Sequence, residues 1–233
     1  MRFPLSCFLF LFFTTAFSQE TGAPIVVAEI KIDSLYREDQ FYVGITYNTL
    51  ADKTAGLTQS KFSAGFTAGF LRDMPINKSR TIAIAPGIGF SYTNYNQNLM
   101  ITGTSQSAIY STINSEDQYS KNKFSYLSVD VPIELRWRSS TFESHKFWRV
   151  YTGVKLSYLL YDKSVFNSEK TNITIKGNDD FNQFQYGAYV SAGYNTINLY
   201  AYYGLNPLFK SANLDGEKIK IRSLNLGLIF YIL

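Results

Sequence analysis

The segment that decides the fold reads Leu127-Ser-Val-Asp-Val-Pro-Ile-Glu-Leu-Arg-Trp137. Its odd-numbered residues are all apolar, and the charged residues Asp130, Glu134 and Arg136 stand between them. A period of two places the apolar side chains on one face of a β-strand and every charge on the other face. About 9–11 residues are enough for a tilted strand to cross a bilayer. Two folds follow from this pattern: a membrane β-barrel with its apolar face toward lipid, or a soluble sandwich with that face in a core.

The start of the chain has the composition of a secretory signal peptide. Arg2 precedes an apolar run over residues 5–13, and Ala16-Phe-Ser18 forms a cleavage site of the small-x-small type. The apolar run is too short for a transmembrane helix. The only cysteine, Cys7, lies inside this run and not at the cleavage point. We therefore expect an exported chain with neither a lipid anchor nor disulfides.

The composition narrows the choice of protein class. The formal net charge is +4, and no long run of like charges suggests a partnership with nucleic acid. Aromatic residues make up 17% of the chain, with 18 Tyr and 19 Phe. The mean hydropathy of -0.10 resembles that of a soluble protein, but a membrane barrel is compatible with it. In a barrel only every second strand residue faces lipid.

Eight segments share the alternating pattern of the first one. An even number of antiparallel strands closes an up-and-down barrel without free edges, so we expect an all-β, eight-stranded antiparallel up-and-down transmembrane β-barrel. The expected strands cover residues 41–49, 61–72, 81–92, 123–138, 148–158, 184–194, 199–205 and 221–233.

Glycines support the barrel over the sandwich. Ten of them fall on the face opposite the apolar one, where a soluble sandwich would more often carry Lys, Glu and Thr. The interior of an eight-stranded barrel is barely wide enough for side chains, so small inward residues relieve crowding. These glycines are Gly44, Gly65, Gly69, Gly87, Gly89, Gly153, Gly187, Gly193, Gly204 and Gly227.

The connections between the expected strands differ in length. Three are short, at residues 73–80, 139–147 and 195–198, whereas those at 93–122 and 159–183 are long and polar. Short periplasmic turns and longer outer loops are typical of outer-membrane barrels, and eight strands place both termini in the periplasm. The expected organisation is a signal peptide at 1–18, a periplasmic leader at 19–39, with a short strand near 25–32, and an outer-membrane β-barrel at 40–233.

Six charged residues are expected to face the barrel lumen and form a charge network. Because an unpaired charge there would cost several kcal/mol, opposite charges should pair across neighbouring strands. The favoured interpretation is a structural ion-pair plug, and the alternative is a polar path for protons or small solutes. Arg136 and Arg138 are expected near the periplasmic mouth, where solvent would weaken their ion pairs. The six residues are Asp130, Glu134, Arg136, Arg138, Arg149 and Lys155.

The sequence gives little support to an enzyme or a metal site. The single histidine, His145, follows Ser144 in an expected turn, and two turn neighbours do not make a nucleophile with an oriented base. One histidine and no mature cysteine leave only carboxylates as metal ligands. Asp179-Asp180 and Asp215-Gly-Glu217 are interpreted as solvated loop residues. We expect no catalytic residues, no metal and no cofactor.

Aromatic residues near the strand ends are expected to anchor the barrel at the membrane interfaces. Loop residues Tyr110 and Tyr119 are candidates for contact with a partner. The expected anchoring residues are Phe41, Phe62, Phe90, Tyr92, Phe147, Trp148 and Tyr158.

Five segments carry a family resemblance, at residues 41–47, 73–78, 131–138, 147–153 and 230–233. They resemble the PorT-type outer-membrane β-barrel proteins of Bacteroidota. The resemblance implies a small barrel in outer-membrane lipid and a connection to the type IX secretion and gliding apparatus, and it offers no catalytic residues. The last residues, 227–233, are similar to the terminal signal that the barrel-insertion machinery recognises. An accessory barrel for secretion or surface assembly is thus the first hypothesis, and a narrow porin-like channel or hydrophobic small-molecule transporter is the alternative.

Overall fold

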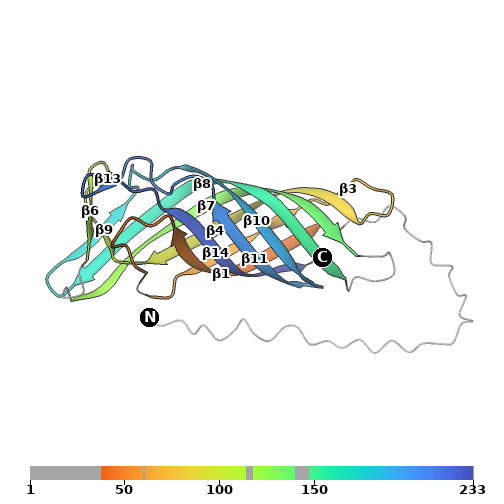
Figure 1. The fold of residues 1–233 in the computed structure, drawn as a ribbon, viewed down its shortest axis with the longest axis horizontal. Helices are drawn as coiled ribbons and strands as arrows, with labels where there is room; N and C mark the ends of the chain where they lie inside the picture. Colours follow the sequence, from red (N-terminus) through yellow and green to blue (C-terminus); the bar gives the residue numbers. More distant parts are fainter. Residues whose placement is uncertain (1–37, 60, 114–117, 140–146, 233) are drawn as a thin grey trace, which may run out of the picture. The chain divides into compact units, whose positions relative to one another are not determined.

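Eight antiparallel strands close into a barrel, as the alternating pattern predicts (Figure 1). The computed structural model describes residues 38–59, 61–113, 118–139 and 147–232. Each strand of the ring pairs with the next, and the last strand pairs with the first from Phe41 opposite Ile232 to Ala51 opposite Arg222. The ring strands are β1 (Gln40–Ala51), β2 (Ala64–Leu71), β4 (Ile82–Asn96), β7 (Tyr119–Arg138), β8 (Trp148–Ser168), β10 (Phe184–Tyr194), β11 (Ile197–Gly204) and β14 (Arg222–Ile232).

The two faces of the barrel wall carry opposite chemistry, and β7 shows this most clearly. Val131 and Leu135 point outward and are 41% and 50% exposed, whereas their preceding neighbours Asp130 and Glu134 are 0% and 2% exposed. A sandwich would bury the apolar face and expose the charged one. Burial therefore excludes the sandwich for the strands that the structure describes. No helix among the described residues is long and apolar enough to cross a membrane.

Inward glycines make room for inward tyrosines. A Cβ atom on Gly187 would lie 2.5 Å from the ring of Tyr202, and one on Gly89 would collide with the hydroxyl of Tyr42. Both tyrosines are buried inside the barrel. Because an eight-stranded barrel has little interior volume, each large ring depends on a neighbouring position without a side chain. The glycine pattern thus reflects the packing of the lumen.

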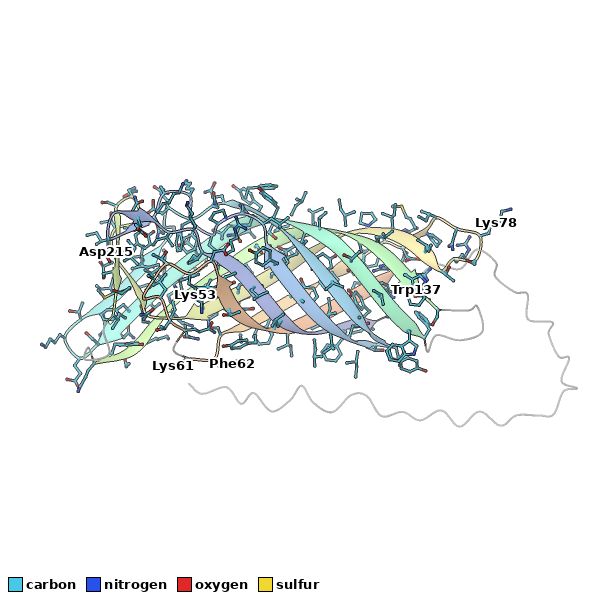
Figure 2. All side chains as sticks on the ribbon, in the orientation of Figure 1. Lys53, Lys61, Phe62, Lys78, Trp137 and Asp215 are labelled. Carbon is cyan, nitrogen blue, oxygen red and sulfur yellow. The ribbon has the colours of Figure 1, made fainter. Side chains whose placement is uncertain are left out.

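The two ends of the barrel are built differently. One end, which we call the turn end, carries the short connections together with the start of β1 and the end of β14. The opposite end, which we call the loop end, carries most of the additional strands (Figure 1). Figure 2 shows Lys78 and Trp137 toward the turn end and Lys53 and Asp215 toward the loop end. The additional strands are β3 (Met74–Pro75) at the turn end, and β5 (Leu99–Gly103), β6 (Ala108–Thr112), β9 (Asn172–Lys176), β12 (Asn213–Leu214) and β13 (Glu217–Lys218) at the loop end.

The expected long polar loops at 93–122 and 159–183 are in large part strands, which corrects the sequence-based interpretation. β7 and β8 continue to Tyr119 and Ser168, well beyond the membrane-facing pattern. A β-bulge explains why the alternating pattern predicts only the first part of β8, up to residue 158. Leu159 pairs with Ser128 and Tyr161 with Leu127, which leaves Leu160 as an extra residue. The bulge reverses the parity of the strand, so the period of two breaks at this point.

A hydrophobic core fills the loop end of the barrel. Inward side chains of the ring strands pack there against side chains from the connections, and we call this cluster the cap. Phe209 is its centre, with ring centroids 4.5 Å from Phe181, 5.5 Å from Tyr110 and 5.8 Å from Phe124. The cap consists of Leu50, Leu57, Tyr95, Leu99, Ile101, Tyr110, Phe124, Tyr126, Leu159, Ile175, Phe181, Leu208, Phe209, Ala212, Leu214, Ile219 and Ile221.

Two of the aromatic predictions are wrong. Tyr110 does not present its ring to a partner, because it is buried in the cap, and this burial raises the pKa of its phenol. Phe147 does not anchor the barrel, because it is only 3% exposed and lies against Arg149. Trp148, the next residue, does point outward and contacts Tyr194 at a centroid distance of 5.6 Å. Alternation along β8 thus separates two adjacent aromatic residues.

Some predictions concern residues outside the described ranges. The signal peptide, the leader up to residue 37 with its expected short strand, and the turn that holds His145 all fall there. Of the expected leader, the structure describes only Glu38 and Asp39. Asp39 forms an ion pair with Arg72 at 2.7 Å, and Glu38 enters the lumen.

Candidate functional site

The predicted lumen charges lie on the inward faces of two neighbouring strands. β7 supplies Asp130, Glu134, Arg136 and Arg138, and β8 supplies Arg149 and Lys155. All six side chains are buried. The structure does not join them in one network. It divides them into a cluster at the turn end, which we call the mouth cluster, and an ion pair in the middle of the barrel.

Asp73 is the centre of the mouth cluster. It lies just after β2 and accepts two hydrogen bonds from Arg138, from Nη1 at 2.8 Å and from Nη2 at 2.9 Å. Its Oδ1 atom also accepts a hydrogen bond from Arg136 Nη1 at 3.1 Å. All three side chains are inaccessible to solvent. A carboxylate that two guanidinium groups share in this way compensates charges that would otherwise be very unfavourable inside a barrel.

Glu134 extends the mouth cluster toward the middle of the barrel. Arg136 Nε donates to Glu134 Oε2 at 2.8 Å. The hydroxyl groups of Tyr189 and Tyr231 donate to Glu134 Oε1, each at 3.0 Å. Tyr189 belongs to β10, two strands from β7 around the ring, and Tyr231 belongs to β14, which is directly opposite β7. One carboxylate therefore connects strands across the lumen.

Glu38 brings the chain that precedes β1 into the mouth cluster. Its backbone nitrogen donates to Asp73 Oδ2 at 3.3 Å, and its backbone oxygen accepts from Arg136 Nη1 at 3.3 Å. Its carboxylate Oε2 accepts from Arg138 Nη1 at 3.4 Å. Because both its backbone and its side chain are hydrogen-bonded, Glu38 is held inside the turn end, where it covers Arg136 and Arg138.

Arg149 is held mainly by an aromatic ring. Its guanidinium carbon lies 4.5 Å from the ring centroid of Phe147, and its backbone is opposite Arg138 across the β7–β8 pair. Within the described residues, its Nε and Nη1 atoms have no hydrogen-bond partner. Arg136 also stacks on a ring, 4.9 Å from the centroid of Tyr151. Aromatic faces thus replace part of the hydration that these cations lose.

The central ion pair joins Asp130 and Lys155. Their charged atoms are 3.5 Å apart. Asp130 also accepts hydrogen bonds from Ser91 and from Ser128, the latter at 2.9 Å. The ammonium group of Lys155 lies 4.5 Å from the ring centroid of Tyr202. Each partner therefore has further polar or aromatic contacts that compensate its removal from water.

The lumen is charge-balanced and nearly solid. In the mouth cluster, the cations Arg136, Arg138 and Arg149 match the anions Glu38, Asp73 and Glu134 in number, and Asp130 matches Lys155. Two cavities of about 10 and 20 Å³ lie beside Lys155 and Tyr200. A cavity needs about 10–15 Å³ on this measure to hold one water molecule. Each of these two cavities has room for about one water molecule.

The six predicted residues are buried inside the barrel, and the structure adds Glu38 and Asp73, which the sequence analysis did not include. Both lie just outside the expected strands, one at the end of the expected leader and one in a turn. The number of charges indicated that anions were missing, because the predicted lumen face has only two anions, Asp130 and Glu134, and four cations. The expectation that solvent weakens the pairing of Arg136 and Arg138 is wrong. Asp73 and Glu38 cover these two arginines, and both have fully buried side chains.

Of the acidic loop residues interpreted as solvated, Asp179, Asp215 and Glu217 are exposed, whereas Asp180 is partly buried. Asp180 accepts hydrogen bonds from the hydroxyls of Tyr110, at 2.9 Å, and Ser211, so it stabilises the cap. Asp215 and Gly216 both have positive φ, at 51° and 84°, and form the tight turn between β12 and β13. Within the ranges described, no group of three or more His, Cys, Asp or Glu could hold a metal ion.

The closed ring with a charged interior and an apolar exterior defines a small transmembrane β-barrel. Residues 17–210 match the family model described as "Outer membrane protein beta-barrel domain", and the chain belongs to this family. The barrel is accordingly an outer-membrane protein.

Comparison with solved structures gives distant similarity. The chain is similar to Ail, the attachment invasion locus protein of Yersinia pestis, with 12% identity and a TM-score of 0.38 over 84% of this chain and 99% of that chain. A second structure, Ail in complex with the heparin analogue sucrose octasulfate, gives the same identity and TM-score over 83% and 97% of the two chains. Similarity at this level says nothing about function. No curated protein matches the sequence.

Proposed function

We propose that this protein is a closed, non-conducting outer-membrane barrel with a structural or accessory role, which holds the folded cap at the cell surface. The filled lumen is the observation that carries the proposal. The mouth cluster occupies the turn end, the Asp130–Lys155 pair occupies the middle and the cap occupies the loop end. A barrel that is filled along its whole length supports a rigid scaffold better than a pore.

The same proposal includes an orientation. The turn end has the short connections, the start of β1 and the end of β14. Outer-membrane barrels have short periplasmic turns and longer outer loops, which supports a periplasmic location for the turn end. The cap then faces the cell exterior. The final strand β14 presents Leu226, Leu228 and Ile232 outward, which supports recognition of this strand by the barrel-insertion machinery.

We also propose that the barrel is not an enzyme. The buried carboxylates of the described lumen, such as Asp73 and Glu134, are engaged by guanidinium and phenol groups. A carboxylate held in this way is neither a free general base nor a free nucleophile. The alternative of a narrow channel or transporter receives no support from cavities of about 10 and 20 Å³.

Planar-bilayer recording tests the closed barrel. The purified full-length protein is expected to insert and to show no steady conductance, because buried ion pairs and the cap occupy the lumen. Glu134→Ala removes the lumen carboxylate that binds Arg136, Tyr189 and Tyr231. Comparison with this variant shows whether any conductance of the wild type passes through the lumen. Steady conductance in the wild type that this variant abolishes would overturn the proposal.

The resemblance to PorT-type barrels supports a link to type IX secretion or surface assembly, with secretion-system components as partners. A rigid scaffold with a folded outer cap is compatible with such an accessory role. Deletion of the encoding gene is expected to lower the amount of surface protein that is exported, and expression of the intact chain should restore it. Export that is unchanged in the deletion strain would remove the secretion link while leaving the scaffold proposal in place.

A further inference from the structure

Lysine residues gather on the outer face of the barrel wall at the loop end. Lys121 and Lys123 lie on β7, Lys163 lies on β8 and Lys176 lies on β9. Lys61, which Figure 2 labels, reaches β7 with its ammonium group, where it donates to the backbone oxygen of Ser120 at 3.1 Å. We call these five residues the lysine patch.

Strand pairing brings the cations of the lysine patch close together. Lys163 lies directly opposite Lys176 in the β8–β9 pair. Lys123 is opposite Val165, two residues beyond Lys163, so it is a diagonal neighbour of Lys163. Like charges directly opposite each other destabilise a sheet unless an anion lies between them. The arrangement is therefore unfavourable for this sheet on its own.

The described residues provide no carboxylate that pairs with the lysine patch. Asp162, next to Lys163 in β8, points the other way, and its Oδ2 accepts a hydrogen bond from the backbone nitrogen of Asn178 at 3.0 Å. The ion pairs found at this end, such as Arg222 with Asp52, involve other residues.

The lysine patch lies directly beyond the lipid-facing surface. The outward row Tyr92, Leu127 and Tyr161 is one step toward the membrane from Lys163 and two steps from Lys123. The next row toward the membrane holds Phe90, Val129 and Tyr158. Lys163 is two residues from Tyr161, which is about 7 Å along an extended strand. Tyrosine rings at a barrel rim mark the interface between hydrocarbon and headgroups. Lys163 and its partner Lys176 are therefore at headgroup level, and Lys123 is one outward row further from the membrane.

We propose that the lysine patch binds the phosphate groups of anionic lipid headgroups in the outer leaflet. Its position beside the aromatic rim and its unpaired positive charge favour this ligand over a soluble one. The proposal rests on the proposed orientation, in which the loop end faces outward. Lysine is well suited to the role because its flexible ammonium group binds phosphate as a point charge. Phosphates between Lys123, Lys163 and Lys176 would remove the repulsion between them.

Lipid binding by the intact barrel tests this proposal. The full-length protein in nanodiscs of uncharged lipid is titrated at low salt with lipid A that carries its phosphates, with dephosphorylated lipid A and with inorganic phosphate. The triple variant Lys123→Gln, Lys163→Gln and Lys176→Gln is expected to lose at least about tenfold in affinity for phosphorylated lipid A, because screened electrostatic contacts dominate such binding. The wild-type barrel should bind phosphorylated lipid A more tightly than dephosphorylated lipid A.

A control triple removes the same charge from the same end of the barrel. Lys53→Gln, Lys210→Gln and Lys220→Gln change exposed residues outside the lysine patch, and their affinity should remain within about twofold of the wild type. Equal affinity in the two triple variants would overturn the proposal. The proposal would also be overturned if inorganic phosphate or a soluble polyanion, at equal phosphate concentration, displaced phosphorylated lipid A completely from the wild-type barrel.

Orientation is checked separately, so its failure is distinct from failure of lipid binding. Outside the expected signal peptide the chain has no cysteine, and Lys210→Cys places a single thiol on the loop end. A membrane-impermeant maleimide should label this variant on intact cells, and absence of labelling would overturn the outward placement. A steady conductance would overturn the closed-barrel proposal without changing either result.

Discussion

Replacing Asp73 with alanine is expected to lower the free energy of unfolding of the barrel by about 3–5 kcal/mol, the cost typical of breaking a buried ion pair from one side. Asp73 accepts two hydrogen bonds from Arg138 and one from Arg136, and its loss leaves both guanidinium groups without this carboxylate inside the barrel. Urea-induced unfolding in detergent micelles, followed by the heat-modifiable gel shift, measures the change.

Two further variants show whether the buried charge is responsible. Asp73→Asn keeps the size and the polar atoms of the side chain, so it should destabilise the barrel nearly as much if charge compensation dominates. Asp52→Ala breaks the exposed ion pair with Arg222 and should leave the free energy of unfolding almost unchanged. If Asp73→Ala and Asp52→Ala unfold at the same urea concentration, the mouth cluster does not stabilise the barrel.

Replacing Phe209 with alanine is expected to destabilise the cap by about 3–5 kcal/mol, the usual range for emptying a fully buried aromatic position. Phe209 is 0% exposed and contacts the rings of Phe124, Phe181 and Tyr110. Because the cap packs on strands that are also held by the ring, the loss should open the connections first. Limited proteolysis on intact cells should then cut the cap while the membrane-embedded strands stay protected.

The matched control for this variant is Ile109→Ala on β6. Ile109 belongs to the same end of the barrel but is 61% exposed, so removing its side chain leaves no cavity. Its proteolysis rate should equal that of the wild type. A Phe209→Ala protein that resists protease as well as the wild type does would show that the cap is held by its backbone pairing and not by its aromatic core.

The membrane-facing part of the fold was predictable because each side chain there obeys one rule. From Leu127 to Trp137 lipid requires an apolar residue at every odd position, and the crowded lumen requires a small or compensated one at every even position. Beyond the membrane this rule ends. Phe124 and Tyr126 turn an aromatic face inward to the cap, and Leu160 adds a bulge, so the period no longer shows which residues form strands.

The site was predictable only in part for a related reason. Strand parity identifies Asp130, Arg136 and the other charges that lie on strands, because their direction is fixed by the alternation. Glu38 and Asp73 lie outside the expected strands, where no period fixes the direction of a side chain. Phe147 differs, because extending the alternation of β8 by one residue places it on the inward face with Arg149 and Tyr151. Only the excess of cations on the lumen face indicated that two anions were missing.

The position of Glu38 has a consequence for biogenesis. It lies two residues before β1, which is three strands from β7 around the ring through β2 and β4. Arg136 and Arg138 on β7 therefore receive this counter-ion across the curved inner face of the sheet. A flat sheet would carry excess positive charge into hydrocarbon, which favours curvature of these four strands before they move fully into the bilayer.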